Sequence, residues 1–155
     1  MPSERRVPLP DVAATHRLAA ELAAGLAPGA VLALTSELGA GKTELTRGLA
    51  AALGVPAAVP VCSPSYLLLN LYRGGRLPLA HFDAYFMQAA DDLERAGLAE
   101  LLAEGWVAVV EWADRVAGAL PAGTQWVALG PGESGPGSRL AVVQAIAPAA
   151  RGALR

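Results

Sequence analysis

The chain has 155 residues, of which 54% are hydrophobic, so it can form the core of one compact domain, residues 1–155, and we expect no second one. Twelve basic and 14 acidic side chains give a net charge of −2, which excludes a strong nonspecific attraction to a nucleic-acid backbone. The longest apolar runs, such as residues 31–34 and 107–110, are far shorter than the roughly 20 residues that span a bilayer, so we expect no contact with a membrane.

The N-terminal residues, MPSERRVPLP, carry arginines but lead into no apolar stretch with a cleavage site, which favours a cytoplasmic protein. We expect residues 1–6 and 150–155 to be flexible ends. Between residues 11 and 26 apolar side chains recur at roughly helical spacing, and Pro28 and Gly29 end the pattern. This segment therefore predicts an amphipathic helix.

A possible phosphate-binding loop follows. Residues 30–36 predict a short apolar strand, and residues 42–53 return to helical composition. Between them, SELGAGKT (36–43) matches the pattern G-x-x-x-x-G-K-[ST], except that Ser36 stands in place of the first glycine. A strand, a glycine-rich loop and a helix form the context in which backbone N–H groups surround a phosphate. We therefore predict a phosphate site, and a chance glycine-rich turn is the alternative.

The two residues that end this pattern have distinct expected roles. Lys42 is the only lysine in the chain, and its compact ammonium suits a position between phosphate oxygens better than a wide guanidinium does. It would reach the β- and γ-phosphates, while the hydroxyl of Thr43 would hold Mg²⁺.

The rest of the chain predicts an α/β protein. Residues 65–73 and 76–85 flank two glycines and predict a β-hairpin, residues 88–105 look helical, and residues 106–112 predict a buried strand. Two more strands are expected at 124–130 and 139–147. The fold class that we predict is a P-loop NTPase fold, with a central mixed sheet flanked by helices and with antiparallel strands from the C-terminal third.

Two carboxylates stand at the ends of predicted strands. Asp83 ends one strand and Glu111 ends another. Either one alone could be a solvated residue or a helix cap, but together they favour a Mg²⁺ site. His81 is expected to pack rather than to catalyse, and Trp112 either stacks on a ligand or belongs to the core.

Five segments together resemble one protein family. They are residues 37–54, 63–66, 81–85, 91–102 and 109–112, and their order and spacing are similar to those of TsaE, the small bacterial ATPase of tRNA threonylcarbamoyladenosine synthesis. The resemblance runs from about residue 9 to residue 146. It implies an ATPase that joins a threonylcarbamoyltransferase catalytic subunit and its accessory subunit, with tRNA contacted through that complex. Hydrolysis of ATP would reset the complex between turnovers.

The resemblance also implies a set of site residues, with ATP and Mg²⁺ as the cofactors. Lys42, Asp83 and Glu111 would be catalytic, and Thr43 and Glu111 would hold the metal. Residues 63–65 would form a switch-like loop near the γ-phosphate. The nucleotide-binding positions would be Asp11, Val12, Glu37, Gly39, Ala40, Gly41, Lys42, Thr43, Glu44, Ser65, Asp83, Trp112 and Arg139.

The chain departs from the family pattern at four positions. The family usually has glycine at Ser36, threonine at Glu44, threonine at Ser65 and arginine at Phe86. A carboxylate at Glu44 would repel the α-phosphate unless it turns away. From the sequence we therefore expect weakened nucleotide binding, and tighter binding by Glu44→Thr.

Three other functions remain to be weighed. A small-molecule kinase shares the loop but needs an arginine-rich lid, and Arg73 and Arg76 flank a hairpin turn instead. A guanine-nucleotide switch needs an N-K-x-D motif, whereas the only asparagine, Asn70, precedes a leucine. A nucleotide-binding scaffold without hydrolysis stays open. No arginine is obviously placed to act as a finger, so we expect slow hydrolysis by the isolated chain and a partner that completes the site.

Overall fold

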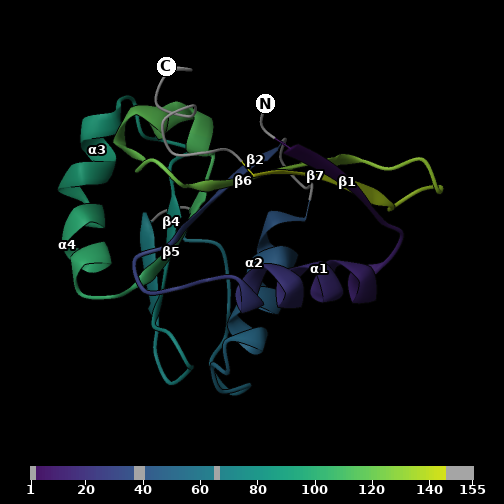
Figure 1. Ribbon diagram of the computed structural model, residues 1–155, viewed down its shortest axis with the longest axis horizontal. Helices are drawn as coiled ribbons and strands as arrows, with labels where there is room; N and C mark the ends of the chain where they lie inside the picture. Colours follow the sequence, from purple (N-terminus) through teal and green to yellow (C-terminus); the bar gives the residue numbers. More distant parts are fainter. Residues whose placement is uncertain (1–2, 37–40, 65–66, 146–155) are drawn as a thin grey trace.

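A single seven-stranded sheet organises the protein. The computed structural model describes residues 3–36, 41–64 and 67–145, and its strands follow the order β1-β7-β6-β2-β5-β4-β3 (Figure 1). The strands are β1 (Ser3–Leu9), β2 (Val31–Ser36), β3 (Leu69–Tyr72), β4 (Leu79–Asp83), β5 (Val107–Glu111), β6 (Gln125–Pro131) and β7 (Arg139–Ala145). The central strands β6, β2, β5 and β4 are parallel, and β7, β1 and β3 are antiparallel to their neighbours.

This architecture is the predicted α/β P-loop fold with a mixed sheet. The C-terminal strand β7 is antiparallel, as expected, and the predicted hairpin is present as β3 and β4. However, the antiparallel strands do not come only from the C-terminal third, because β1 and β3 form the two edges of the sheet. At an edge one side of a strand stays unpaired, which is where antiparallel additions to a parallel sheet are commonly found.

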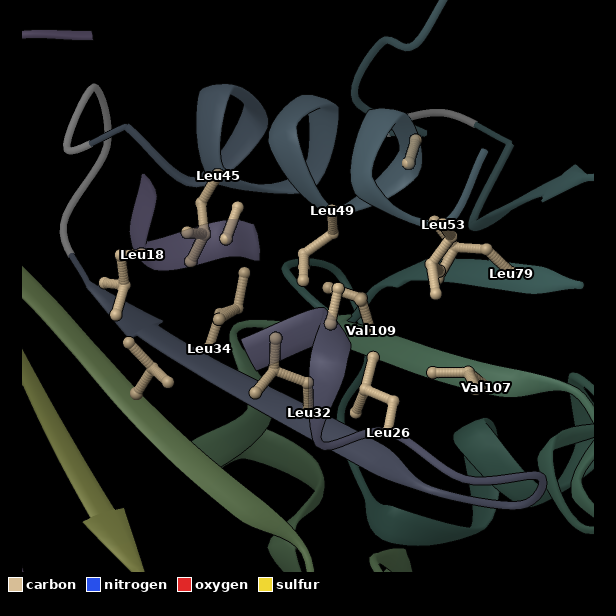
Figure 2. Packing of buried hydrophobic residues seen from close by; sticks show 14 of the residues in the cluster. Leu18, Leu26, Leu32, Leu34, Leu45, Leu49, Leu53, Leu79, Val107 and Val109 are labelled. Atoms are coloured by element: carbon tan, nitrogen blue, oxygen red, sulfur yellow. The ribbon is translucent and has the colours of Figure 1, made fainter. Parts of the chain in front are cut away.

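Helices cover both faces of the sheet. On one face lie α1 (Val12–Ala24) and α2 (Lys42–Ala52), and on the other lie α3 (Ala90–Arg95), α4 (Leu98–Ala103) and the 3₁₀ helix η1 (Ala113–Ala119) (Figure 1). Because both faces are covered, β2 is apolar on both sides: Leu32 and Leu34 face one core, and Val31 and Ala33 face the other. Figure 2 shows the first core, with leucines of α2 above the leucines of β2.

Helices α1 and α2 approach each other closely at Gly48. A Cβ placed on Gly48 would lie 2.7 Å from the Cβ of Ala19 and 3.1 Å from Cδ2 of His16. Glycine is therefore required in the middle of α2 for these two helices to reach this separation. On the same side, the carboxylate of Glu44 contacts the imidazole of His16 at 2.7 Å and also pairs with Arg47 in its own helix.

Two expectations need correction. Residues 1–6 were expected to be a flexible end, but Ser3 to Arg6 belong to β1, which pairs with β7 along its whole length. The sequence of β1 has no clear apolar alternation, and the strand forms because its backbone hydrogen-bonds to β7. As an edge strand it also tolerates Pro8, which has no N–H to donate. The helical region 88–105 is divided into α3 and α4, because Gly97 between them adopts φ +99.

No helix among the described ranges is both long and apolar enough to cross a membrane.

Candidate functional site

The predicted site residues of the central strands meet at the carboxyl edge of the sheet, which is the side where the parallel strands end. In the parallel register Leu34 pairs with Glu111, and Glu111 pairs with Asp83. The carboxyl ends of β2, β5 and β4 therefore lie side by side, with α2 beginning just after β2. Ligands of open α/β sheets bind at this edge, beyond the carboxyl ends of the strands.

The N-cap residue of α2 is a glycine, which has no side chain to cap the helix. Gly41 precedes the helix with φ +95 and makes no side-chain cap, whereas α1 has its cap in Asp11, whose Oδ1 accepts a hydrogen bond from Ala14 N at 2.8 Å. A glycine is favoured at that φ, since a Cβ would be strained there. The first-turn N–H groups of α2, together with the positive end of the helix, form a suitable environment for a phosphate.

Lys42 is held in a confined position at this helix start. Its side chain is 6% exposed, and its Nζ lies 4.1 Å from the centre of the Trp112 ring. Burial lowers the pKa of Lys42 below its ordinary value of 10.5, and the negative charges of Glu111 and Asp83 oppose this effect. An ammonium that lacks water around it gains more from a phosphate than an exposed one does.

The two strand-end carboxylates are buried and oriented. Asp83 is 4% exposed, and its Oδ1 accepts a hydrogen bond from the backbone N–H of Tyr85 at 2.9 Å. Glu111 is 3% exposed, and its Oε2 lies 2.5 Å from Nε2 of the fully buried His81. The sequence correctly predicts that His81 packs inside, but the hydrogen bond to Glu111 is not predicted. A signal for it exists: His81 lies two residues before Asp83 and so shares a face of β4 with it, and Asp83 pairs with Glu111 on the parallel strand β5.

An aromatic group lies next to Lys42. Trp112 adopts φ 57 and ψ 38, a left-handed conformation that costs a non-glycine residue about 1–2 kcal/mol. This turn directs the indole toward Lys42, and the indole also meets the Tyr85 ring edge-on at 5.0 Å. Trp112 is half-buried: it packs against the core on the α3 side of the sheet and also contacts Lys42 at the site. A cationic residue that sequence reasoning missed, Arg115, rests against the same two rings.

The remaining described candidates lie along the same edge, on the other side of β2. Arg139 pairs with Leu9 across β7 and β1, just before Asp11 and Val12 begin α1. Val12 is 55% exposed, and Arg139 Nη1 donates to the carbonyl of Ser138 at 3.1 Å. The structure therefore brings the N-terminal and late basic positions together, with β6 between Arg139 on β7 and the strand β2.

The carboxylate of Glu44 is engaged by other side chains. Its two carboxylate oxygens are engaged by His16 on α1 and by Arg47 on α2. Because Arg47 pairs with this carboxylate and offsets part of its charge, we expect less repulsion of an α-phosphate than the sequence alone suggests. The nucleotide affinity itself stays a prediction. Thr43 stands beside Glu44 in the first turn and is half-buried.

Four predicted nucleotide-binding positions fall outside the described residues. They are Glu37, Gly39, Ala40 and Ser65.

The oxygen donors at this edge fit magnesium better than a softer metal. Within the described parts of the chain no group of three or more His, Cys, Asp and Glu side chains could hold a metal by itself. Mg²⁺ usually takes one or two protein oxygens together with water and substrate phosphates. The hydroxyl of Thr43 and the buried carboxylate of Glu111 are donors of this kind.

Comparisons with known proteins agree with this architecture. The family model for the threonylcarbamoyl adenosine biosynthesis protein TsaE matches residues 9–135. The chain is 41% identical over 107 residues to the tRNA threonylcarbamoyladenosine biosynthesis protein TsaE of Bacillus subtilis, covering 69% of this chain and 65% of the relative. It is 38% identical over 104 residues to the TsaE protein of Treponema pallidum, covering 67% of this chain and 75% of the relative.

A third relative and a solved structure extend this comparison. The TsaE protein of a Synechocystis strain is 42% identical over 77 residues, which cover 50% of this chain and 48% of that protein. The matches thus span less than two thirds of the length of the Bacillus subtilis and Synechocystis relatives. The crystal structure of Bacillus subtilis YdiB superposes with a TM-score of 0.76 at 30% identity, covering 94% of this chain and 88% of that one. Fold, length of match and identity together mean that the chain belongs to the TsaE family of tRNA threonylcarbamoyladenosine biosynthesis proteins.

Proposed function

We propose that this chain binds and hydrolyses ATP with Mg²⁺, as a subunit of the complex that makes N6-threonylcarbamoyladenosine in tRNA. Its partners in this proposal are the threonylcarbamoyltransferase catalytic subunit and its accessory subunit, and ATP turnover resets that complex between rounds. The single observation that carries the proposal is the position of Lys42. Its ammonium is nearly buried at the start of α2, just after Gly41, and is attracted by Glu111 and Asp83.

The residues have separate tasks in this proposal. The amides of the first turn of α2 and the Lys42 ammonium bind the phosphates, and the Thr43 hydroxyl and Glu111 carboxylate hold the metal. Bound Mg²⁺ neutralises charge on the phosphate oxygens. Asp83, fixed by the N–H of Tyr85, accepts a hydrogen bond from the attacking water and orients it.

His81 is a positioning residue in this scheme. With Glu111 ionised, Nε2–H of His81 donates to Oε2 and fixes the carboxylate at the end of β5. This hydrogen bond resembles the outer contacts that orient metal-binding carboxylates in other proteins.

Binding can be tested before turnover. We expect isothermal titration to detect MgATP and MgADP binding to the chain, and to detect none for Lys42→Met. In EDTA the affinity of the unmodified chain for ATP should fall, and Glu111→Gln should lose most of this metal dependence. Glu100→Gln, which removes an exposed carboxylate on α4, is the matched control and should keep it. Absence of binding by the unmodified chain at millimolar nucleotide would reject the proposal.

Turnover separates the ATPase from the scaffold and the kinase. Phosphate release should be slow for the isolated chain and should increase when both transferase subunits are added. Binding without phosphate release under either condition would favour the non-hydrolysing scaffold. Release stimulated instead by a small phosphate acceptor would favour a kinase.

A further inference from the structure

Arg115 lies at the site but has no role so far. It belongs to η1, which follows directly after β5 and Trp112. Its guanidinium carbon lies 5.3 Å from the centre of the Tyr85 ring and 5.7 Å from the centre of the Trp112 ring. The Lys42 ammonium lies 4.1 Å from the centre of this same indole. One tryptophan thus holds the two cations next to the ends of β4 and β5.

Among the described residues, no ion pair neutralises the charge of Arg115. Some exposed arginines have a carboxylate partner within the described chain, such as Arg5 with Glu21 and Arg95 with Asp92, although Arg73 has none there. Arg115 has none there, and it contacts aromatic rings instead. A solvent-exposed guanidinium is held only weakly by an aromatic ring, whereas hydrogen bonds to a phosphate are charge-assisted and can be bidentate.

The topology tells which end of a nucleotide would be near Arg115. Asp11 and Arg139, two of the positions expected to contact the nucleotide but given no role at the metal or the attacking water, lie beyond β6 on one side of β2. Glu111 and Asp83, the metal and water positions, lie on the other side, on β5 and β4. A triphosphate that lies across the start of α2 therefore has its terminal phosphate on the β5 side, which is the side that η1 extends from.

We propose that Arg115 contacts the terminal phosphate of the bound triphosphate, as an arginine supplied by the chain itself. This inference rests on the proposed function. In the ligand-free protein the rings of Trp112 and Tyr85 hold the guanidinium beside the site. The contact would make the site prefer a triphosphate over a diphosphate, and it would supply from the chain itself an arginine that the sequence does not obviously place at the site.

The test compares nucleotides that differ in one phosphate. In the presence of Mg²⁺, isothermal titration would measure the affinities for a non-hydrolysable ATP analogue and for ADP. The proteins compared are the unmodified chain, Arg115→Gln and Arg115→Lys. We expect Arg115→Gln to bind the triphosphate analogue about tenfold more weakly, the size of one charge-assisted hydrogen bond, and to bind ADP within about twofold of the unmodified chain. Arg115→Lys, which keeps the charge but loses the planar fork, should lie between them.

The chain offers a close control. Arg73 lies 4.7 Å from the Trp106 ring, a similar arginine on a tryptophan, but Trp106 precedes β5 at the opposite edge of the sheet. Arg73→Gln should change neither affinity. Equal losses of triphosphate and diphosphate affinity in both Arg115 variants would mean that Arg115 only supports the rings, and would overturn the inference. Unchanged affinities in both variants would overturn it as well. Either result leaves the proposed function intact. Should the unmodified chain bind neither nucleotide, the proposed function and this inference both fail.

Discussion

Substitution of Gly48 by alanine tests the packing of α1 on α2, because the sign of the change in the free energy of unfolding depends on how closely the two helices approach. In an unobstructed helix, glycine to alanine stabilises by about 1 kcal/mol. Here the new Cβ would lie 2.7 Å from the Cβ of Ala19, where carbon atoms prefer about 3.5–4.0 Å, so the helices must separate by roughly 1 Å. Such overpacking costs about 1–3 kcal/mol. We therefore expect Gly48→Ala to lower the free energy of unfolding by about 1 kcal/mol, and the Tm by about 2–4 °C.

The assay is urea denaturation with a matched control and a rescue. At Gly25, at the end of α1, a Cβ would meet only the carbonyl oxygen of Leu22 at 3.6 Å, so Gly25→Ala should be neutral or stabilising. Adding Ala19→Gly to Gly48→Ala makes room, and a double-mutant cycle should show a coupling of about 1 kcal/mol between the two sites. A Gly48→Ala protein that is more stable than the unmodified chain would refute the close approach of the helices.

Three further predictions concern the site. Lys42→Met should not lower the Tm of the ligand-free protein, because burial, the largest cause of the lowered pKa of Lys42, outweighs attraction by nearby carboxylates. Because the pKa of Lys42 is lower in the folded protein, the unfolded chain holds the Lys42 proton more tightly. The free energy of unfolding of the unmodified chain should therefore rise as the pH increases toward 10.5. Denaturation of Lys42→Met at several alkaline pH values should show no such rise. His81→Ala leaves Glu111 buried without its imidazole and should cost about 3 kcal/mol in urea denaturation, so a loss below about 1 kcal/mol would contradict this pairing. Glu44→Thr should lower the free energy of unfolding by less than about 1 kcal/mol, through the lost bridge to His16. It should change the ATP affinity measured by calorimetry less than about twofold. Clearly tighter ATP binding would instead support the repulsion of the α-phosphate inferred from the sequence.

Local patterns in the sequence predict the central part of the fold well. The run 31–34 is continuously apolar because both faces of β2 are covered, and the glycine-rich loop separates it from the helix at Lys42, as the pattern requires. The carboxylates Asp83 and Glu111 are predictable because each ends such a strand. These features depend on residues that are near one another in the chain, so a single sequence contains them.

Features that depend on pairing between distant segments are not predictable in this way. β1 has little pattern of its own and is a strand only because β7 lies beside it. The break between α3 and α4 lies at Gly97, whose positive φ composition alone does not reveal. The environments of Glu44 and Arg115 are also set by distant elements, since His16 lies on another helix and Tyr85 follows another strand.

The pairing of β1 with β7 has a consequence for folding. In the described sheet β1 has no other neighbour, and Leu9 at its end pairs with Arg139, so this contact closes a loop of most of the chain. Long-range pairing of this kind raises the contact order and slows folding. During synthesis on a ribosome, β1 has to wait until β7 has emerged. The edge of the sheet that carries Asp11 would then be the last to form.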